Sequence, residues 1–173
     1  MLYWIVRFIA SVVSKLLFRL EAKGVENIPK VGGFILASNH TSYLDPIVLS
    51  SACPRKLNFM ARHDLFYSPL FSWLISKVGA FPVKRDSPDL SALKEAMRRL
   101  KNGNGLLLFP EGTRQVNGVS LSEPQPGIGF LAAKVNVPVI PAFVKGSVKA
   151  LPKGAKCIRA GKISVYFGKP RSF

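Results

Sequence analysis

Residues 1–20 form an apolar segment that carries one stripe of polar side chains. No turn residue interrupts the segment, so the pattern predicts a single helix. At roughly 100° per residue, the polar side chains fall within about 140° of the helical wheel, and they are Arg7, Ser11, Ser14, Lys15 and Arg19. Apolar side chains occupy the rest of the wheel. Such an amphipathic helix suits a membrane interface, and we expect it to lie in the headgroup plane.

Other placements of this helix are open from the pattern alone. Twenty residues are just long enough to cross a hydrocarbon core of ~30 Å, although an Arg near the middle of a span costs about 2.5–3.5 kcal/mol. The apolar face could instead pack on the protein's own core. A cleaved signal peptide fits less well, because charges are interspersed through the apolar run and no small-residue cleavage site follows.

Short apolar runs typical of buried parallel strands occur further along the chain, at residues 33–38, 105–109, 137–144 and 163–167. Helix signals alternate with these runs. Pro46 follows Asp45 as a possible N-cap, and Ser-Pro pairs at 68–69 and 87–88 open two more helices. The alternation predicts an α/β fold with a mostly parallel central sheet flanked by helices.

Length and composition fit one packed domain that attracts an anionic partner. The 173 residues are 48% hydrophobic, and we divide them into a membrane-interface helix, residues 1–23, and one domain, residues 24–173. Lys and Arg number 25 against 9 Asp and Glu, a net charge of +16, and no acidic residue follows Glu123. The charge favours a lipid surface, a phosphorylated substrate, an acidic carrier or nucleic acid. Nucleic acid is disfavoured because no reader motif is present.

The two cysteines carry little functional signal. Cys53 and Cys157 lie far apart, with no CxxC or Cys/His spacing, so the sequence suggests neither a disulfide framework nor a zinc site. We expect both to be buried as small hydrophobic residues in a protein of a reducing compartment.

The segment NHTSYLD, residues 39–45, follows an expected strand and precedes an expected helix. His40 could take a proton from a hydroxyl nucleophile, and the Asp45 carboxylate could hold its other ring nitrogen. A hydrogen-bonded loop histidine and a plain helix cap are equally open from the spacing. No GxSxG elbow occurs and neither cysteine neighbours a histidine, so we expect direct attack by a substrate hydroxyl without an acyl-enzyme.

Two further segments place charges at strand ends. In FPEGTR, residues 109–114, Glu111 and Arg114 flank a turn at Gly112, where Arg114 could bind an anionic oxygen or simply pair with Glu111 on the surface. In GAFPVKRD, residues 79–86, two adjacent cations could grip a phosphate or be plain solvated charges.

Four blocks together carry a family resemblance, namely NHTSYLD, GAFPVKRD, FPEGTR and VPVIPAFV. They stand in the order, and at about the spacing, of the blocks of glycerolipid acyltransferases, and the chain resembles the bacterial 1-acyl-glycerol-3-phosphate acyltransferases over roughly residues 24–168. Many members continue with further helix beyond the point where this chain ends. Gln115 stands where the family often has Ser, a difference we expect to be tolerated.

The resemblance implies roles for particular residues. His40 would be the general base and Asp45 its orienting partner. Pro141 would lie near the acyl-donor side. The glycerol phosphate of the acceptor would be bound by Lys84, Arg85, Glu111, Gly112, Thr113 and Arg114. For the apolar groove, the aromatic segment 66–78 offers Phe71, Trp73 and Leu74, although ordinary core is the more common role for any single one of them.

The resemblance also implies a reaction and a location. Family members transfer a fatty acyl group from acyl-CoA or acyl carrier protein to the sn-2 hydroxyl of lysophosphatidic acid, giving phosphatidic acid for phospholipid biosynthesis. They work at the cytoplasmic face of the bacterial cell membrane and need no metal or other cofactor. A backbone N–H in the turn 39–45 or 111–114 would hold the oxyanion. A different acceptor, such as glycerol-3-phosphate or another lysophospholipid, stays open, as does a non-catalytic basic membrane-binding module.

Overall fold

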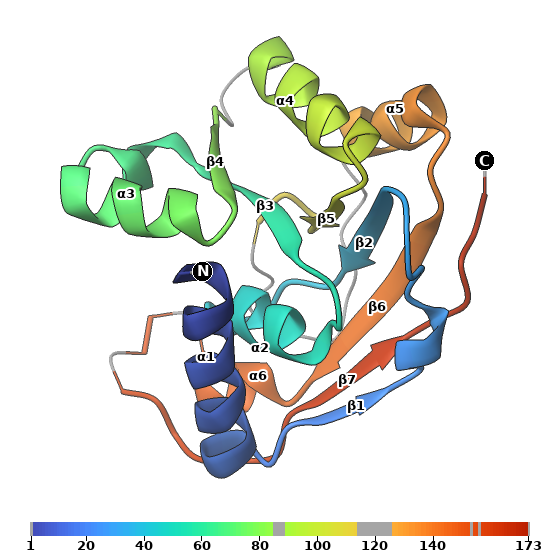
Figure 1. Ribbon diagram of the computed structural model, residues 1–173. Coiled ribbons are helices and arrows are strands. Elements are labelled where there is room, and N and C mark those ends of the chain that lie inside the picture. The colour runs from blue at the N-terminus through green and yellow to red at the C-terminus, as the bar shows by residue number, and fades with distance from the viewer. Residues whose placement is uncertain (1, 85–88, 114–125, 153, 156, 173) are drawn as a thin grey trace.

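A seven-stranded sheet forms the centre of the structure, a computed structural model (Figure 1). It describes residues 2–84, 89–113, 126–152, 154–155 and 157–172. Across the sheet the strands run in the order β1-β7-β6-β2-β5-β3-β4. Their bounds are β1 Glu21–Lys23, β2 Phe34–Ser38, β3 Leu57–Arg62, β4 Ala80–Val83, β5 Gly105–Leu108, β6 Val139–Lys145 and β7 Ser164–Phe167.

The expected α/β class with a mostly parallel sheet is confirmed. Strands β6, β2, β5, β3 and β4 are mutually parallel, so their carboxyl ends meet at one edge. Strand β7 is antiparallel to β6, and β1 runs parallel to β7. The carboxyl edge of the five parallel strands therefore also receives the amino ends of β7 and β1.

Helices cover both faces of the sheet. Helices α1 and α2 pack together on one face, while α4 packs on β5 and against α5 on the other (Figure 1). Helix α3 lies beside β4 and the 3-10 turn η2. Their bounds are α1 Leu2–Phe18, η1 Val25–Asn27, α2 Asp45–Ala52, η2 His63–Phe66, α3 Pro69–Lys77, α4 Leu90–Lys101, α5 Pro126–Val135 and α6 Ser147–Ala150.

Alternation along the strands divides the core between the two faces. In β2, Phe34 and Leu36 join the α1/α2 side, whereas Ile35 joins the α4/α5 side. All three are completely buried. A hydrophobic core covers each face of β2, so its apolar run has no solvent-facing side.

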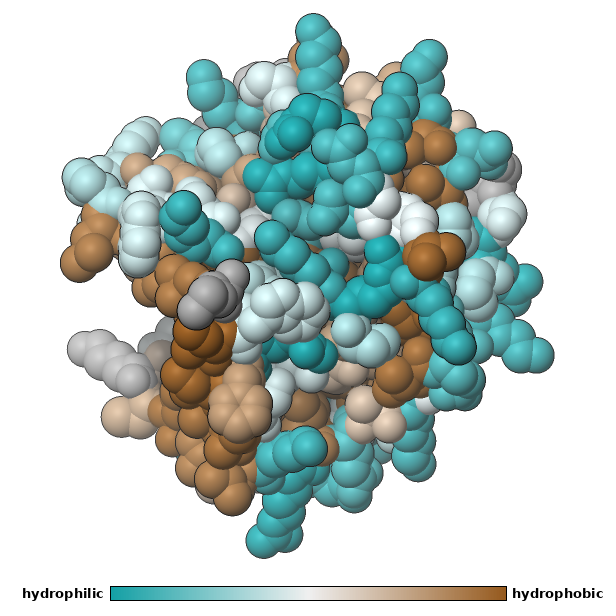
Figure 2. Space-filling model, viewed as in Figure 1, coloured by the Kyte–Doolittle hydropathy of each residue, from teal (hydrophilic) through white to brown (hydrophobic). Residues whose placement is uncertain are grey.

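Helix α1 forms as expected; within its polar stripe Arg7 and Ser14 face the protein, whereas Lys15 and Arg19 are exposed. Arg7 donates hydrogen bonds to the carbonyl oxygens of Ser50 and Cys53 at the end of α2, and Ser14 is buried. The apolar stripe faces outward, with side chains 40–76% exposed at Trp4, Ile5, Phe8, Ile9, Val12, Val13, Leu16 and Leu17. Figure 2 shows this apolar surface over α1. Packing of the apolar stripe on the protein's own core is therefore wrong.

Among the described residues, no helix combines the length and the apolar character that a membrane span requires.

Two expectations about burial are wrong. Cys53 is buried, but Cys157 is exposed. The aromatic helix α3 contains no buried residue, and Phe71, Trp73 and Leu74 are 40–53% exposed, so these three are not ordinary core. Helix α3 packs mainly on β4 and η2, and its apolar side chains are left partly exposed.

Helix α4 begins with a cap that the Ser-Pro signal did not indicate. The Asp89 carboxylate accepts from the backbone N–H groups of Lys84 and Ala92 and from the Ser91 hydroxyl. These bonds, that from Lys84 first, lower the pKa of Asp89 from 3.8 to about 2. Asp89 therefore starts α4 and also fixes the backbone after β4.

Replacing Asp89 with Ala should lower the free energy of unfolding by about 1 kcal/mol at neutral pH, because the cap is lost. The midpoint temperature of thermal unfolding should fall by about 2–4 °C. Since the folded-state pKa is depressed, the charge stabilises the fold fully above about pH 4, and this contribution fades as pH falls through about 2. Asp89→Asn, a non-titrating cap, is the control. A wild-type advantage over Asp89→Ala that is undiminished at pH 2 would contradict the assignment.

Candidate active site

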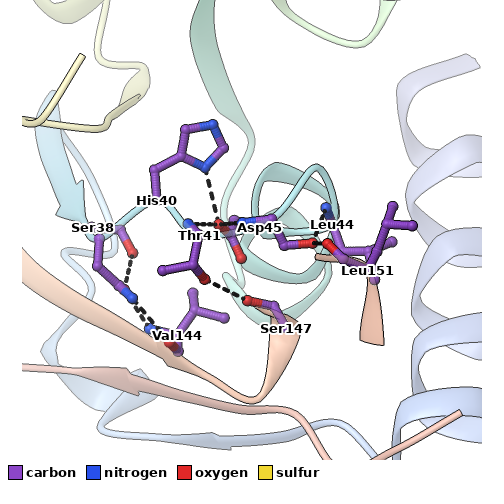
Figure 3. Close-up of polar contacts among 10 residues, drawn as sticks. Ser38, His40, Thr41, Leu44, Asp45, Val144, Ser147 and Leu151 are labelled. Atoms are coloured by element: carbon purple, nitrogen blue, oxygen red, sulfur yellow. Dashed lines mark hydrogen bonds and ion pairs between the residues drawn. The ribbon is translucent and has the colours of Figure 1, made fainter. Parts of the chain in front are cut away.

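One carboxylate oxygen organises the loop at the carboxyl end of β2. Asp45 is completely buried, and its Oδ2 accepts from His40 Nδ1 at 3.0 Å, Thr41 N at 2.6 Å and Ser42 N at 2.7 Å (Figure 3). Asp45 is the first residue of α2, and Leu44 holds the cap position without a side-chain bond. The plain helix-cap alternative is therefore wrong, because the carboxylate turns back onto its own loop.

His40 is held in one orientation by two contacts. Nδ1 meets the Asp45 carboxylate, and the imidazole stacks on the Phe109 ring with centroids 4.0 Å apart and planes at 18°. A carboxylate accepts hydrogen bonds, so Nδ1 carries the proton and Nε2 keeps its lone pair. Only 12% of the His40 side chain is exposed. Sequence reasoning missed Phe109, although it opens the FPEGTR segment.

Three polar side chains tie this loop to β6 and to the segment that follows β6. Asn39 Nδ2 donates to Val144 O at 3.0 Å, and Val144 N donates to Asn39 Oδ1 at 2.7 Å. The Thr41 and Ser147 hydroxyls lie 3.1 Å apart, and Ser42 Oγ donates to the carbonyl oxygen of Leu151 at 2.8 Å. Asn39 thus pairs with β6 as a strand residue would. We call the Asn39–Val144 pair the latch.

The FPEGTR segment begins at the end of β5, next to β2. Gly112 adopts a positive φ of 67°, and its N–H donates to Phe109 O, which closes the turn. Within it Glu111 is 5% exposed and Thr113 is exposed. Glu111 is therefore a buried carboxylate rather than a surface one. Arg114 lies outside the described residues.

The remaining candidates lie on both sides of β2. Pro141 is in β6 opposite Ala37 of β2, so it neighbours the strand that carries the loop. Lys84 is exposed directly after β4, the strand at the far edge of the sheet. Arg85 lies outside the described residues. In the described part of the chain, no three His, Cys, Asp or Glu side chains gather as a metal site would require.

Several backbone amides near His40 are already engaged. The Asp45 carboxylate accepts hydrogen bonds from the N–H groups of Thr41 and Ser42. The N–H of Leu44 donates to Ser42 Oγ, and that of Gly112 donates to the carbonyl oxygen of Phe109. These four donors are excluded as oxyanion partners in this conformation.

A family model described as Acyltransferase matches residues 19–145. The chain belongs to the acyltransferase family. It is 32% identical over 172 residues to the chloroplastic 1-acyl-sn-glycerol-3-phosphate acyltransferase LPAT1 of Arabidopsis thaliana, covering 97% of this chain and 48% of that protein. The enzyme of that name from Bacillus subtilis is 31% identical over 146 residues, 84% of this chain and 70% of the relative.

The fold of this acyltransferase matches a solved relative. The crystal structure of the 1-acyl-sn-glycerophosphate acyltransferase PlsC from Thermotoga maritima aligns with a TM-score of 0.83 and 29% identity, covering 98% of this chain and 68% of that one. The chain spans about half the length of the two chloroplastic relatives from Brassica napus and Arabidopsis thaliana.

Replacing Asn39 with Ala should break the latch and lower kcat of this acyltransferase at least tenfold, because the loop that holds His40 loses its tie to β6. Val144 N and O would be left buried without partners, so unfolding free energy should fall by about 1–3 kcal/mol. Urea unfolding and kcat measured well below the transition separate the two effects.

The matched control is Asn58→Ala. Asn58 is also buried, and it bonds to Gly105 O and to the Arg99 guanidinium, on the far side of β5 from the loop. Its loss should destabilise the fold comparably and leave kcat near wild type. Equal kcat losses in both variants would show that the latch contributes to stability and has no separate effect on kcat.

Proposed function

We propose that this protein transfers a fatty acyl group from an acyl thioester to the sn-2 hydroxyl of 1-acyl-glycerol-3-phosphate, giving phosphatidic acid. The observation that carries the proposal is the 3.0 Å contact between His40 Nδ1 and the buried Asp45 carboxylate at the carboxyl edge of the sheet. Family membership and the names of the relatives support the reaction type and the acceptor.

His40 acts as general base and then as general acid. Nε2 takes the proton of the acceptor hydroxyl as the oxygen attacks the thioester carbonyl carbon, and Asp45 stabilises the imidazolium through Nδ1. The tetrahedral intermediate collapses with cleavage of the C–S bond. The departing thiolate then takes the proton from His40, so no acyl-enzyme, metal or cofactor enters the scheme.

The acceptor phosphate is proposed to lie near the FPEGTR and KRD segments. Arg85 and Arg114 would bind the phosphate oxygens, with Lys84 adding charge. Glu111, buried beside the Gly112 turn, would hold the glycerol part or orient Arg114. Gly112 and Thr113 would lie next to the bound acceptor. Pro141 would lie toward the acyl donor, on the other side of β2.

Helix α1 is proposed to dock on the cytoplasmic face of the membrane, where the acceptor resides. Eight of its side chains expose apolar surface outward, which supports insertion among acyl chains rather than contact with water. Lys15 and Arg19 are exposed near its carboxyl end and would meet anionic headgroups. Docking and catalysis would then share one lipid surface.

Replacing His40 with Ala should lower kcat by about 10²–10⁴-fold, the usual contribution of a general base. Purified protein in detergent is assayed with lysophosphatidic acid or glycerol-3-phosphate, with acyl-CoA or acyl carrier protein as donor, and products are read by mass. The control is His63→Ala, which removes the other histidine and should keep turnover. His40→Ala protein that is folded and retains most of its turnover would refute the general-base assignment.

Replacing Phe8 and Leu16 with Gln should strongly reduce co-sedimentation with vesicles that contain phosphatidylglycerol. These side chains are 70% and 76% exposed, so the fold should not suffer. The matched control changes Val31 and Leu90 to Gln, since these apolar residues are 82% and 67% exposed away from α1. Unchanged binding by the Phe8/Leu16 variant would rule out docking through α1.

A further inference from the structure

The sheet leaves one part of its surface uncovered. On β6, Val139 packs with the α4/α5 core, and the next residues on this face are Pro141, Phe143 and Lys145, all exposed. The α4/α5 core includes no residue of β7 or β1. Beyond β6, therefore, no helix of the described chain fills this face of the sheet.

A cavity of about 630 Å³ occupies that surface. Strand pairing sets Phe143 opposite Tyr166, and Tyr166 opposite Lys23, so the three side chains share one face across three strands. Asn39 and Thr41 also line the cavity. It therefore adjoins the residues on either side of His40, and its volume is that of a small-molecule site.

The charge of this cavity is strongly positive. Four lysines line it with a single carboxylate, and they are Lys23, Lys145, Lys149 and Lys162 beside Glu21. Glu21 is engaged with Lys162 at 2.7 Å. Lys145 and Lys149 form no ion pair with any residue that the structure describes. The cavity thus presents uncompensated ammonium groups that favour phosphate oxygens.

Aromatic side chains give the cavity a second chemical property. Phe143 is 46% exposed and Tyr166 is 37% exposed, and they are direct cross-strand neighbours. Exposed rings on a sheet, flanked by lysines, suit a flat heteroaromatic base joined to phosphates. The Lys23 ammonium lies over one ring, 5.9 Å from the Tyr166 centroid, so a lipid headgroup or an inorganic anion would use the other lysines and leave Phe143 without a stacking partner.

We propose that this cavity binds the 3′-phosphorylated adenosine diphosphate end of acyl-CoA. The base would stack on Phe143 or Tyr166, and the phosphates would meet Lys145 and Lys149. The inference rests on the proposed function for its thioester donor, and it selects the nucleotide form of that donor. From this position the flexible pantetheine arm reaches over the 39–44 loop toward His40.

The test is equilibrium binding of free CoA, dephospho-CoA and pantetheine to the purified full chain, measured by calorimetry in detergent. Wild-type protein should bind CoA at least tenfold more tightly than dephospho-CoA, and pantetheine weakest. Changing both Lys145 and Lys149 to Gln should remove most of the preference for CoA. Tyr166→Leu should weaken CoA and dephospho-CoA alike, because both carry the base.

The matched control changes Lys94 and Lys101 to Gln, which removes two exposed charges from α4. It should bind CoA as wild type does. Equal CoA affinity in the Lys145/Lys149 variant and this control would overturn the proposal. The proposal would also be overturned if the Lys145/Lys149 variant lost only its turnover with acyl carrier protein, because the lysines would then bind a carrier protein. Loss of binding to anionic vesicles alone would overturn it too, because the lysines would then bind a lipid surface.

Steady-state kinetics provide an independent readout. The Lys145/Lys149 variant should raise the KM for acyl-CoA at least fivefold more than the KM for the acceptor. Because CoA binding is measured without turnover, the two proposals fail separately. Tight lysine-dependent CoA binding without phosphatidic acid formation would contradict only the proposed function, whereas turnover without such binding would contradict only the cavity assignment.

Discussion

The active-site loop depends on one buried oxygen, Oδ2 of Asp45. A carboxylate without exposure is costly unless it is hydrogen-bonded, and three N–H donors meet this atom within 3.0 Å. Two of the donors are backbone amides, so the charge fixes the chain as well as the imidazole. His40 cannot turn away without leaving part of that charge unpaired. Loop shape and the orientation of His40 are therefore set by the same interaction.

The parallel sheet brings distant parts of the chain to this oxygen. Strand β2 lies between β5 and β6, so the ends of all three strands meet at one edge. Phe109, which follows β5, stacks on the His40 ring. Val144 in β6 bonds to Asn39 in the latch, although the two residues are 105 positions apart in the sequence. Each motif supplies a different constraint on one loop. The sequence blocks work together because adjacent parallel strands carry them.

Patterning in the sequence predicts β2, β5, β6 and β7 and misses β1 and β3. The runs that become β2, β5, β6 and β7 are visible, because each is nearly all apolar. Strand β3 lacks a clean pattern because Asn58 interrupts it, yet Asn58 is buried and both polar atoms of its side chain are hydrogen-bonded. Strand β1 has three exposed residues and no pattern at all. The pairing of His40 with Asp45 was foreseen as chemistry, but Phe109 and the latch depend on strand order, which periodicity does not encode.

The outward apolar stripe of α1 shows why a helical wheel alone cannot assign a helix to its environment. The wheel separates two faces, but which face meets the protein depends on partners elsewhere. Arg7 finds carbonyl oxygens at the carboxyl end of α2, where helical carbonyls lack internal partners and a cation is favourable. Helix α2 is eight residues long, or about 12 Å, and begins at Asp45. One short helix therefore joins the outward apolar surface of α1 to the carboxylate that orients His40, so the fold fixes the position of His40 relative to that apolar surface.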